Sequence, residues 1–222
     1  MRVALTFDAE HPGRPSPGKR ILDSLLEILG TASVRATFFM QGRWASAYPE
    51  QARAIAASGH LVGSHSHHHA DMRMMTPDGF LDDLALARSA IETASGLDPM
   101  PWFRLPFGLG SNDEHIVAAI GQAGYRHVMW DCDSLDWRAA TSKQIEARVW
   151  RLAKKRDEST VLFHTWPGDT PEGVRAIIKR VKEADGEFIT VAELAGEVPL
   201  HAGVEPRRPD PRNLRRGARP RR

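Results

Sequence analysis

The sequence predicts an α/β protein in which about seven parallel strands are covered by helices, either as a doubly wound sheet or as a barrel. Short apolar runs alternate with amphipathic segments along most of the chain, and glycine or proline marks many of the boundaries. The chain has 222 residues, of which 41% are hydrophobic and 26% are charged. This length fits one large domain or two small ones, and it is sufficient to bury a core without disulfides or a structural metal.

The predicted strands are short apolar runs bounded by turn residues, a pattern typical of buried strands. They cover residues 2–8, 34–40, 61–64, 102–104, 125–130, 160–163 and 187–190. No G-x-G-x-x-G or G-x-x-x-x-G-K-[ST] motif follows any of these strands. The sequence therefore argues against a nucleotide-binding protein.

The predicted helices have apolar residues three or four positions apart. They cover residues 17–30, 49–59, 77–96, 112–123, 141–155 and 171–184. The first helix closes at Gly30, and the second begins at Pro49 and stops at Gly59. Thr76 is the expected N-cap of the third helix, which ends at Gly96. These terminal signals support the alternation of strands and helices.

The charge distribution divides the sequence near residue 200. Residues 201–222 contain eight arginines and four prolines but only two acidic residues, so they cannot bury enough apolar surface to become ordered. Because the whole chain carries +2 and this tail +6, residues 1–200 carry −4. We expect one domain over residues 1–200 and a basic, disordered tail over 201–222. The acidic body argues against nucleic-acid binding.

The cysteine count and the lack of long apolar runs exclude further classes of protein. The single cysteine, Cys132, excludes an intramolecular disulfide framework and multi-cysteine zinc modules. No run approaches about 18 consecutive apolar residues, so no membrane-spanning helix is expected. An acidic residue at position 8 comes too early for a signal peptide. We expect a cytoplasmic protein if the sequence is complete, and an extracytoplasmic one if a leader has been lost.

Five polar or charged residues lie at or directly after the carboxyl ends of predicted strands. They are Asp8, His65, Arg104, Asp131 and His164. Catalytic groups gather at this edge in both barrels and open α/β sheets. The sequence therefore predicts an active site there, although a surface turn at Arg104 and a structural histidine at His164 are the simpler readings of each residue alone.

The histidine-rich segment after residue 64 predicts a metal site. The H-x-x-x-H spacing of His65 and His69 places both rings on one side of a helical turn, whereas His67 and His68 point elsewhere. A polar loop without a ligand is the alternative. A catalytic site usually needs a third protein ligand besides two histidines.

The first strand offers the missing acid. Asp8 and Glu10 stand two residues apart in an extended segment and so share a side. One of them could bind the metal while the other acts as a base. Taken alone, an acidic strand end is more often a helix cap or a surface turn.

Five short motifs occur in a fixed order at the spacing of strand–helix units. They are T-F-D at residues 6–8, H-S-x-x-H at 65–69, R-x-P-x-G at 104–108, D-S-x-D-W at 133–137 and L-x-H at 162–164. In this order the chain resembles the polysaccharide deacetylase family, the metal-dependent carbohydrate esterases of family 4 that share the NodB homology domain. The resemblance covers nearly all of residues 1–200.

The resemblance implies a distorted (β/α) barrel that hydrolyses an N-acyl amide, usually N-acetyl, of a carbohydrate. Carried over by motif, Asp8 is the general base oriented by Arg104, and His164 is the general acid supported by Asp133. Three further residues serve the substrate: Trp137 and Leu162 wall the acyl pocket, and the backbone N–H of Phe107 helps to hold the oxyanion. His65 and His69 are metal ligands.

One position departs from the family pattern. The usual motif has two adjacent aspartates, of which the second binds the metal, and this chain has Ala9 there. We expect Glu10 to replace it, with Asp8 as ligand and Glu10 as base the alternative. One divalent ion is expected, zinc first and cobalt or another transition metal otherwise. The alternative functions are a cytoplasmic hydrolase of small amides and an inactive module that binds carbohydrate.

Overall fold

The computed structural model describes residues 1–11, 13 and 17–196. The basic segment expected at residues 201–222 lies outside this range, so the domain boundary at residue 200 stays a prediction. Within the described ranges, no helix combines the length and the apolar character needed to cross a membrane.

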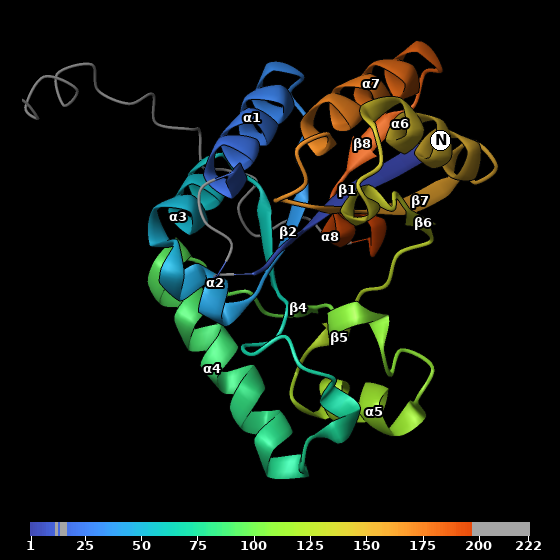
Figure 1. Cartoon of the computed structure of the whole chain (residues 1–222). Helices are drawn as coiled ribbons and strands as arrows, with labels where there is room; N and C mark the ends of the chain where they lie inside the picture. The colour runs from blue at the N-terminus through green and yellow to red at the C-terminus, as the bar shows by residue number, and fades with distance from the viewer. Residues whose placement is uncertain (12, 14–16, 197–222) are drawn as a thin grey trace, which may run out of the picture.

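The described strands form one parallel sheet, curled into an incomplete barrel (Figure 1). Its path runs β5-β4-β3-β2-β1-β7-β6, with β8 beside β1. The strands are β1 (Arg2–Ala9), β2 (Thr37–Met40), β3 (Leu61–Ser64), β4 (Trp102–Phe103), β5 (Arg126–His127), β6 (Cys132–Asp133), β7 (Glu158–His164) and β8 (Glu187–Ile189). The expected distorted barrel is confirmed.

The sheet branches at β1, the longest of the described strands. Strand β7 pairs with β1 from Arg2 to Asp8 along one side. The other side is divided, because β8 occupies its amino-terminal part and β2 pairs only with Thr6 to Ala9. Strands β1 and β2 therefore meet at their carboxyl ends, which brings the end of β1 close to the ends of its neighbours.

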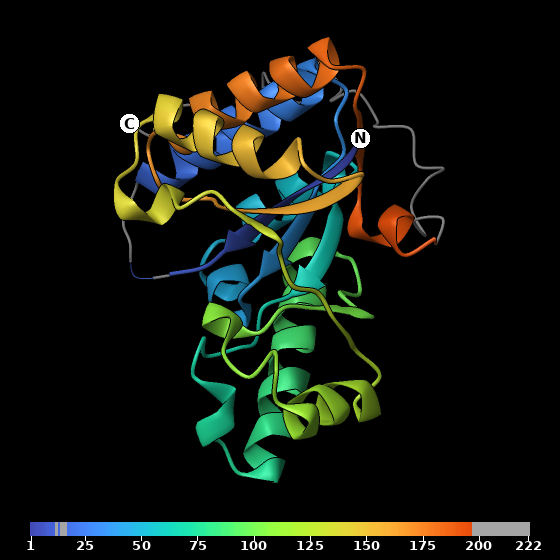
Figure 2. The same ribbon diagram turned by 90° about the vertical axis from the view of Figure 1, so that its right-hand side faces the viewer.

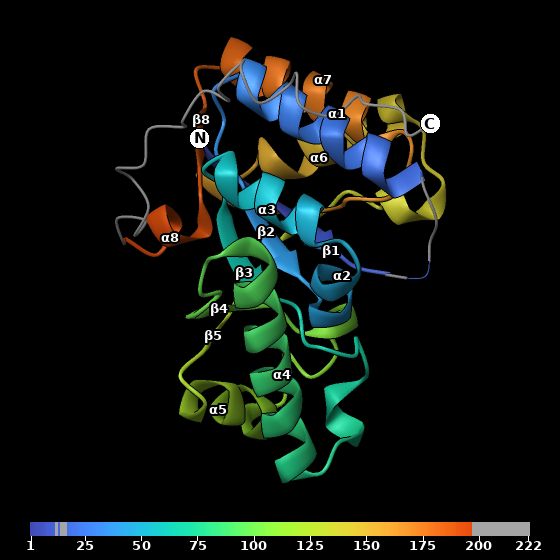
Figure 3. The same ribbon diagram turned by 90° about the vertical axis from the view of Figure 1, so that its left-hand side faces the viewer.

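The helices lie outside the sheet. They are α1 (Pro17–Thr31), α2 (Gly42–Ala47), α3 (Pro49–Ala57), α4 (Pro77–Ser95), α5 (Glu114–Gln122), α6 (Ser142–Ala153), α7 (Thr170–Glu183) and α8 (Val191–Leu194). Figures 2 and 3 show α1, α6 and α7 together at one end of the molecule and α4 and α5 at the other. The expected N-cap is present, since Thr76 Oγ1 accepts a hydrogen bond from the Gly79 N–H at 3.2 Å. The short helices α2 and α8 were not predicted.

Alternation along β1 separates the hydrophobic core from the site. Val3, Leu5, Phe7 and Ala9 all belong to the main hydrophobic core. The Phe7 ring stacks on Phe38 with ring centroids 4.8 Å apart. Because successive side chains of a strand point to opposite faces, Asp8 leaves the sheet on the face opposite to Ala9.

The predicted strand over residues 125–130 is wrong beyond residue 127. Strand β5 is only two residues long, and a separate strand, β6, begins at Cys132. The backbone N–H of Asp131 bonds to the Thr160 carbonyl, and Thr160 stands opposite Ala4 in the register of β7 with β1. Asp131 therefore lies four register positions before Asp8 and outside the predicted site. Its carboxylate instead accepts the Thr160 N–H at 3.2 Å.

Candidate functional site

The carboxyl ends of four strands of the sheet, β1, β3, β4 and β7, bring the predicted polar residues together. Asp8 lies directly opposite His164 in the β1–β7 register. His65 follows β3, and Arg104 follows β4, where the Arg104 N–H bonds to the Ser64 carbonyl. Glu10 comes directly after β1, on the same side as Asp8. All these strands are parallel, so their ends meet at one edge.

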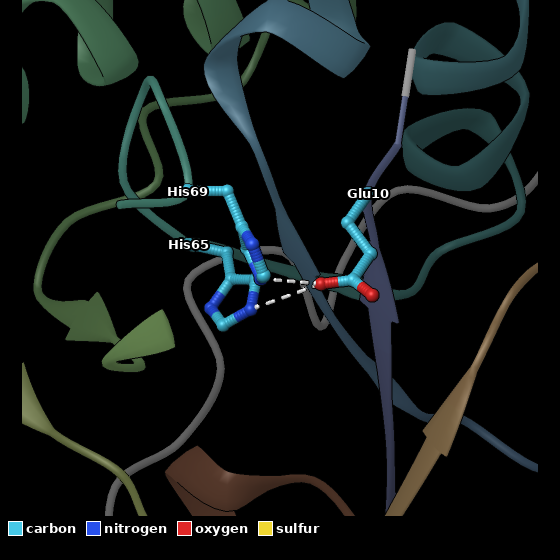
Figure 4. A group of neighbouring side chains, drawn as sticks. All are labelled: Glu10, His65 and His69. Atoms are coloured by element: carbon cyan, nitrogen blue, oxygen red, sulfur yellow. Dashed lines mark ion pairs between the residues drawn. The ribbon is translucent and has the colours of Figure 1, made fainter. Parts of the chain in front are cut away.

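Glu10, His65 and His69 form a compact group at this edge (Figure 4). Glu10 Oε2 lies 2.5 Å from His69 Nε2 and 3.5 Å from His65 Nε2. Each residue offers one ligand atom, and these three atoms lie within 4.8 Å of one another. Glu10 and His65 are buried, and Figure 4 shows both imidazoles facing the carboxylate.

The two histidines are joined by a loop and not by the helical turn that we expected from their spacing. Ser66 and His69 have left-handed backbone angles, with φ of 62° and 56°. Ser66 Oγ accepts the His69 N–H at 2.9 Å, which closes the loop. The left-handed residues reverse the chain within five positions, and this returns His69 to the side of His65.

The His65 ring is oriented as a metal ligand would be. Its Nδ1 lies 2.9 Å from the Arg104 carbonyl oxygen, which can only accept, so Nδ1 carries the proton. Nε2 then faces two carboxylates, Asp8 Oδ2 and Glu10 Oε2, each at 3.5 Å. Burial lowers the pKa of His65, but Asp8 and Glu10 raise it more, and the net shift is upward. This arrangement favours a cation between His65 Nε2 and the two carboxylates.

The two imidazoles and the carboxylate suit zinc or another transition metal of intermediate softness. Two imidazole nitrogens and one carboxylate are a common protein ligand set for zinc in catalytic sites. A protein contact on the other nitrogen of a ligating histidine, such as the one between His65 and Arg104, is the usual support for such a ligand. The residues present therefore fit the metal that the motifs imply.

The second oxygen of Glu10 is occupied by other groups. His11 Nε2 lies 2.8 Å from Glu10 Oε1, and Trp166 Nε1 donates to the same oxygen at 3.3 Å. Burial alone would raise the pKa of Glu10, but hydrogen bonds from His11, His65 and His69 hold it well below its ordinary value. Glu10 is thus an ionised carboxylate whose Oε2 is directed at the two histidines.

Arg104 lies behind Asp8 and is fully buried. Its Nη1 donates to Asp8 Oδ1 at 2.9 Å, and its Nε donates to the Val128 carbonyl at 3.2 Å. The guanidinium also lies over the Phe39 ring, 4.2 Å from the centroid. Arg104 therefore holds Asp8 through Oδ1, and the other oxygen, Oδ2, is turned towards His65.

The partner of His164 is Asp136, and the expectation that Asp133 supports it is wrong. His164 Nδ1 lies 2.8 Å from Asp136 Oδ1. The other Asp136 oxygen accepts the His164 N–H and the Thr170 hydroxyl, both at 2.8 Å. Asp133 Oδ1 instead accepts the Leu135 N–H at 2.8 Å and caps a local turn. Leu135 adopts a left-handed conformation, after which the chain turns and buries Asp136.

The pKa of His164 is raised well above its ordinary value. Burial lowers its pKa, but the hydrogen bond and charge of Asp136, helped by Glu10 and Asp8, raise it to about 9. The imidazole is therefore protonated at neutral pH. Its Nε2 lies 3.9 Å from Glu10 Oε1, at the cavity.

A cavity of about 470 Å³ opens over these groups. Its lining residues are Asp8, Glu10, His11, His65, His69, Phe107, Trp130, Asp133, Trp137, Leu162, His164 and Trp166. Nine of the eleven residues singled out from the sequence are among them; Arg104 lies behind Asp8, and Asp131 lies outside the site. The Phe107 ring stands edge-on to His69 with centroids 4.4 Å apart, and Trp137 remains 42% exposed.

Sequence reasoning did not predict three contacts of the site, those that Asp136 makes with His164 and that His11 and Trp166 make with Glu10. Asp136 was visible as the second acid of D-S-x-D-W, but nothing in that motif says which acid reaches His164. His11 directly follows Glu10, and Trp166 follows His164 by two residues, so proximity along the chain was the only available signal. Their shared contact with Glu10 Oε1 depends on the pairing of β1 with β7.

A known family model and several bacterial proteins match this chain. The family model described as polysaccharide deacetylase matches residues 1–128. The uncharacterised protein YlxY of Bacillus subtilis is 34% identical over 184 residues, which cover 82% of this chain and 56% of YlxY. Peptidoglycan-N-acetylmuramic acid deacetylase PdaA of the same organism is 25% identical over 196 residues, covering 88% of this chain and 72% of PdaA.

The fold is also found in a solved structure, that of BA3943 from Bacillus anthracis, described as a CE4 family pseudoenzyme. It has a TM-score of 0.78 and 28% identity, covering 87% of this chain and 64% of BA3943. A mutant of BA3943 is described as having restored enzymatic activity. The chain thus spans little more than half of YlxY and less than two thirds of BA3943.

Proposed function

The chain belongs to the polysaccharide deacetylase family, and from this premise we propose that it is a metal-dependent hydrolase that removes an N-acyl group, N-acetyl first, from a carbohydrate. The observation that carries the proposal is one cavity that holds a two-histidine, one-carboxylate group together with Asp8 and the paired His164. Each of these has a distinct task in amide hydrolysis.

Glu10, His65 and His69 are the proposed metal ligands. They would hold a divalent ion, which would supply a lower pKa for water and polarisation of the amide carbonyl. Zinc is the first candidate, and cobalt or another transition metal suits the same donors. Glu10 takes the place left by Ala9, whose side chain belongs to the hydrophobic core on the other face of β1.

Asp8 is the proposed general base. Its Oδ2 is available on the cavity side, because Arg104 holds Oδ1. As water attacks the acyl carbon, Asp8 accepts one of its protons. The buried guanidinium of Arg104 balances the charge of Asp8 and fixes its orientation.

His164 is the proposed general acid. An amine is a poor leaving group until it is protonated, so the C–N bond breaks only when a proton reaches the nitrogen. The raised pKa of His164, about 9, keeps it protonated at neutral pH. Asp136 binds Nδ1 and leaves the Nε2 proton available for the departing amine.

The walls of the cavity suit the apolar acyl group and the sugar ring. Leu162 and Trp137 line it, and Trp130 and Trp166 add aromatic faces on which a sugar could stack. The Phe107 N–H is the proposed donor to the developing oxyanion, a contribution typically worth about 3 to 4 kcal/mol of barrier. PdaA, a peptidoglycan deacetylase by name, makes N-acetylated wall glycans the first substrates to test.

The decisive test is acetate release by the purified, zinc-loaded protein. N-acetylated glycan fragments and a simple alkyl acetamide serve as parallel substrates, and Asp8→Asn is the matched inactive control. Acetate released from the glycan by the wild type alone supports the proposal. Preference for the simple acetamide would favour the small-amide hydrolase instead.

An inactive carbohydrate-binding module is the second candidate. Two observations favour it: Ala9 replaces an expected acidic ligand, and a similar structure is described as a pseudoenzyme. This candidate predicts saturable glycan binding with no acetate release even when zinc is bound. The same assay therefore separates the two functions.

A further inference from the structure

A buried aspartate on α4 binds the loop that joins the two proposed metal histidines. Asp83 is only 2% exposed. One of its oxygens accepts the His67 N–H at 2.7 Å, and the other accepts the His68 N–H at 3.1 Å. The second oxygen also lies 2.8 Å from His68 Nδ1. All three donors belong to the segment between His65 and His69.

The same loop is held from its other side by α2. The Gly42 N–H donates to the Ser66 carbonyl at 2.9 Å, and the Arg43 N–H donates to the His67 carbonyl at 3.3 Å. A Cβ on Gly42 would lie 2.5 Å from His67 Nδ1 and 2.9 Å from Ala87 Cα, so only glycine permits this approach. The loop is therefore clamped between α2, which binds its carbonyls, and α4, which binds its amides.

The clamp maintains a backbone conformation that the loop would not adopt alone. Ser66 and His69 both have positive φ angles, and neither is a glycine. Such conformations persist only where the surroundings over-determine them. Because His69 is itself one of these residues, the loop geometry directly sets the direction of its imidazole.

We infer that Asp83 is a positioning residue for the metal site. Its carboxylate holds the amides of His67 and His68, and so holds His65 and His69 where both meet Glu10 Oε2. Asparagine could not replace it, because the amide would turn an NH₂ group towards one of the N–H donors. The inference rests on the proposed metal site, but Asp83 does not line the cavity and is no ligand.

The experiment compares Asp83→Asn with Asp82→Asn. Asp82 is the exposed neighbour on the same helix, so the control makes the same chemical change without touching the loop. Zinc affinity of the purified proteins is measured by competition with a chromophoric chelator, and the melting temperature of each metal-free protein is recorded. We expect Asp83→Asn to bind zinc about 10- to 100-fold more weakly, as for other groups that orient metal ligands, and Asp82→Asn to match the wild type.

Equal zinc affinity in Asp83→Asn and wild type would overturn the inference while leaving the metal site intact. A lower melting temperature with unchanged zinc affinity would also overturn it, because Asp83 would then be merely structural. A wild type that binds no zinc would overturn the proposed function itself and the inference with it. If Asp83→Asn does not fold, amide exchange in the wild type decides: protected His67 and His68 amides support the clamp, and rapid exchange refutes it.

Discussion

Replacing Asp136 with asparagine should move the alkaline limb of activity to lower pH. His164 has a pKa of about 9, raised mainly by its hydrogen bond to Asp136 and by that carboxylate's charge. A hydrogen bond to a charged group contributes about 1.5 to 3 kcal/mol, and one pKa unit corresponds to about 1.4 kcal/mol. Losing the carboxylate should therefore lower the pKa of His164 by about 1 to 2 units. The acid form of His164 would then be lost at lower pH.

The measurement is kcat/KM for acetate release against pH, with wild type, Asp136→Asn and Asp133→Asn all loaded with zinc. Neither variant changes a metal ligand or the charges of Glu10 and Asp8. A difference between their alkaline limbs therefore shows which aspartate raises the pKa of His164. The alkaline limb of Asp133→Asn should fall at the same pH as that of the wild type. If Asp136→Asn kept the wild-type limb, or Asp133→Asn moved it further, the pairing of Asp136 with His164 would not govern the acid.

Three further results are expected. Glu10→Gln should weaken zinc binding at least about tenfold in chelator competition, because an amide carries no charge, whereas His11→Ala should weaken it less; the reverse order would exclude Glu10 as a ligand. Asp8→Asn should abolish most turnover yet retain zinc in elemental analysis, and loss of the metal would make Asp8 a ligand. The metal-free protein should lose up to about 3 kcal/mol of unfolding free energy, measured with urea, as pH rises from about 6.5 to 9. The pKa of His164 is raised on folding, so its stabilisation is complete below the unfolded value and lost through the folded one. His164→Gln should flatten this dependence, and an unchanged slope would show that other groups cause it.

Local patterns were sufficient for most of the fold. The helix over Pro77–Ser95 was predictable because its N-cap, first proline and closing Gly96 are all signals within the helix and its ends. Strands β5 and β6, each two residues long, gave no such signal: β5 was predicted too long, and β6 was missed. Such short strands are defined by their partners across the sheet and not by their own composition.

The sequence by itself determined that the site lies at the carboxyl edge of a parallel sheet, and that Asp8 and Glu10 share one side of β1. The first follows from polar residues at the carboxyl ends of predicted parallel strands. The second follows from the fixed alternation of strand side chains, which needs no long-range information. Only the tertiary structure decided that Asp136 and not Asp133 binds His164, and that Asp83 binds the metal loop. These choices depend on how left-handed turns at Leu135, Ser66 and His69 bring chain segments against β7 and α4. Contacts between distant segments are set by packing of the whole sheet and its helices, and no short motif encodes them.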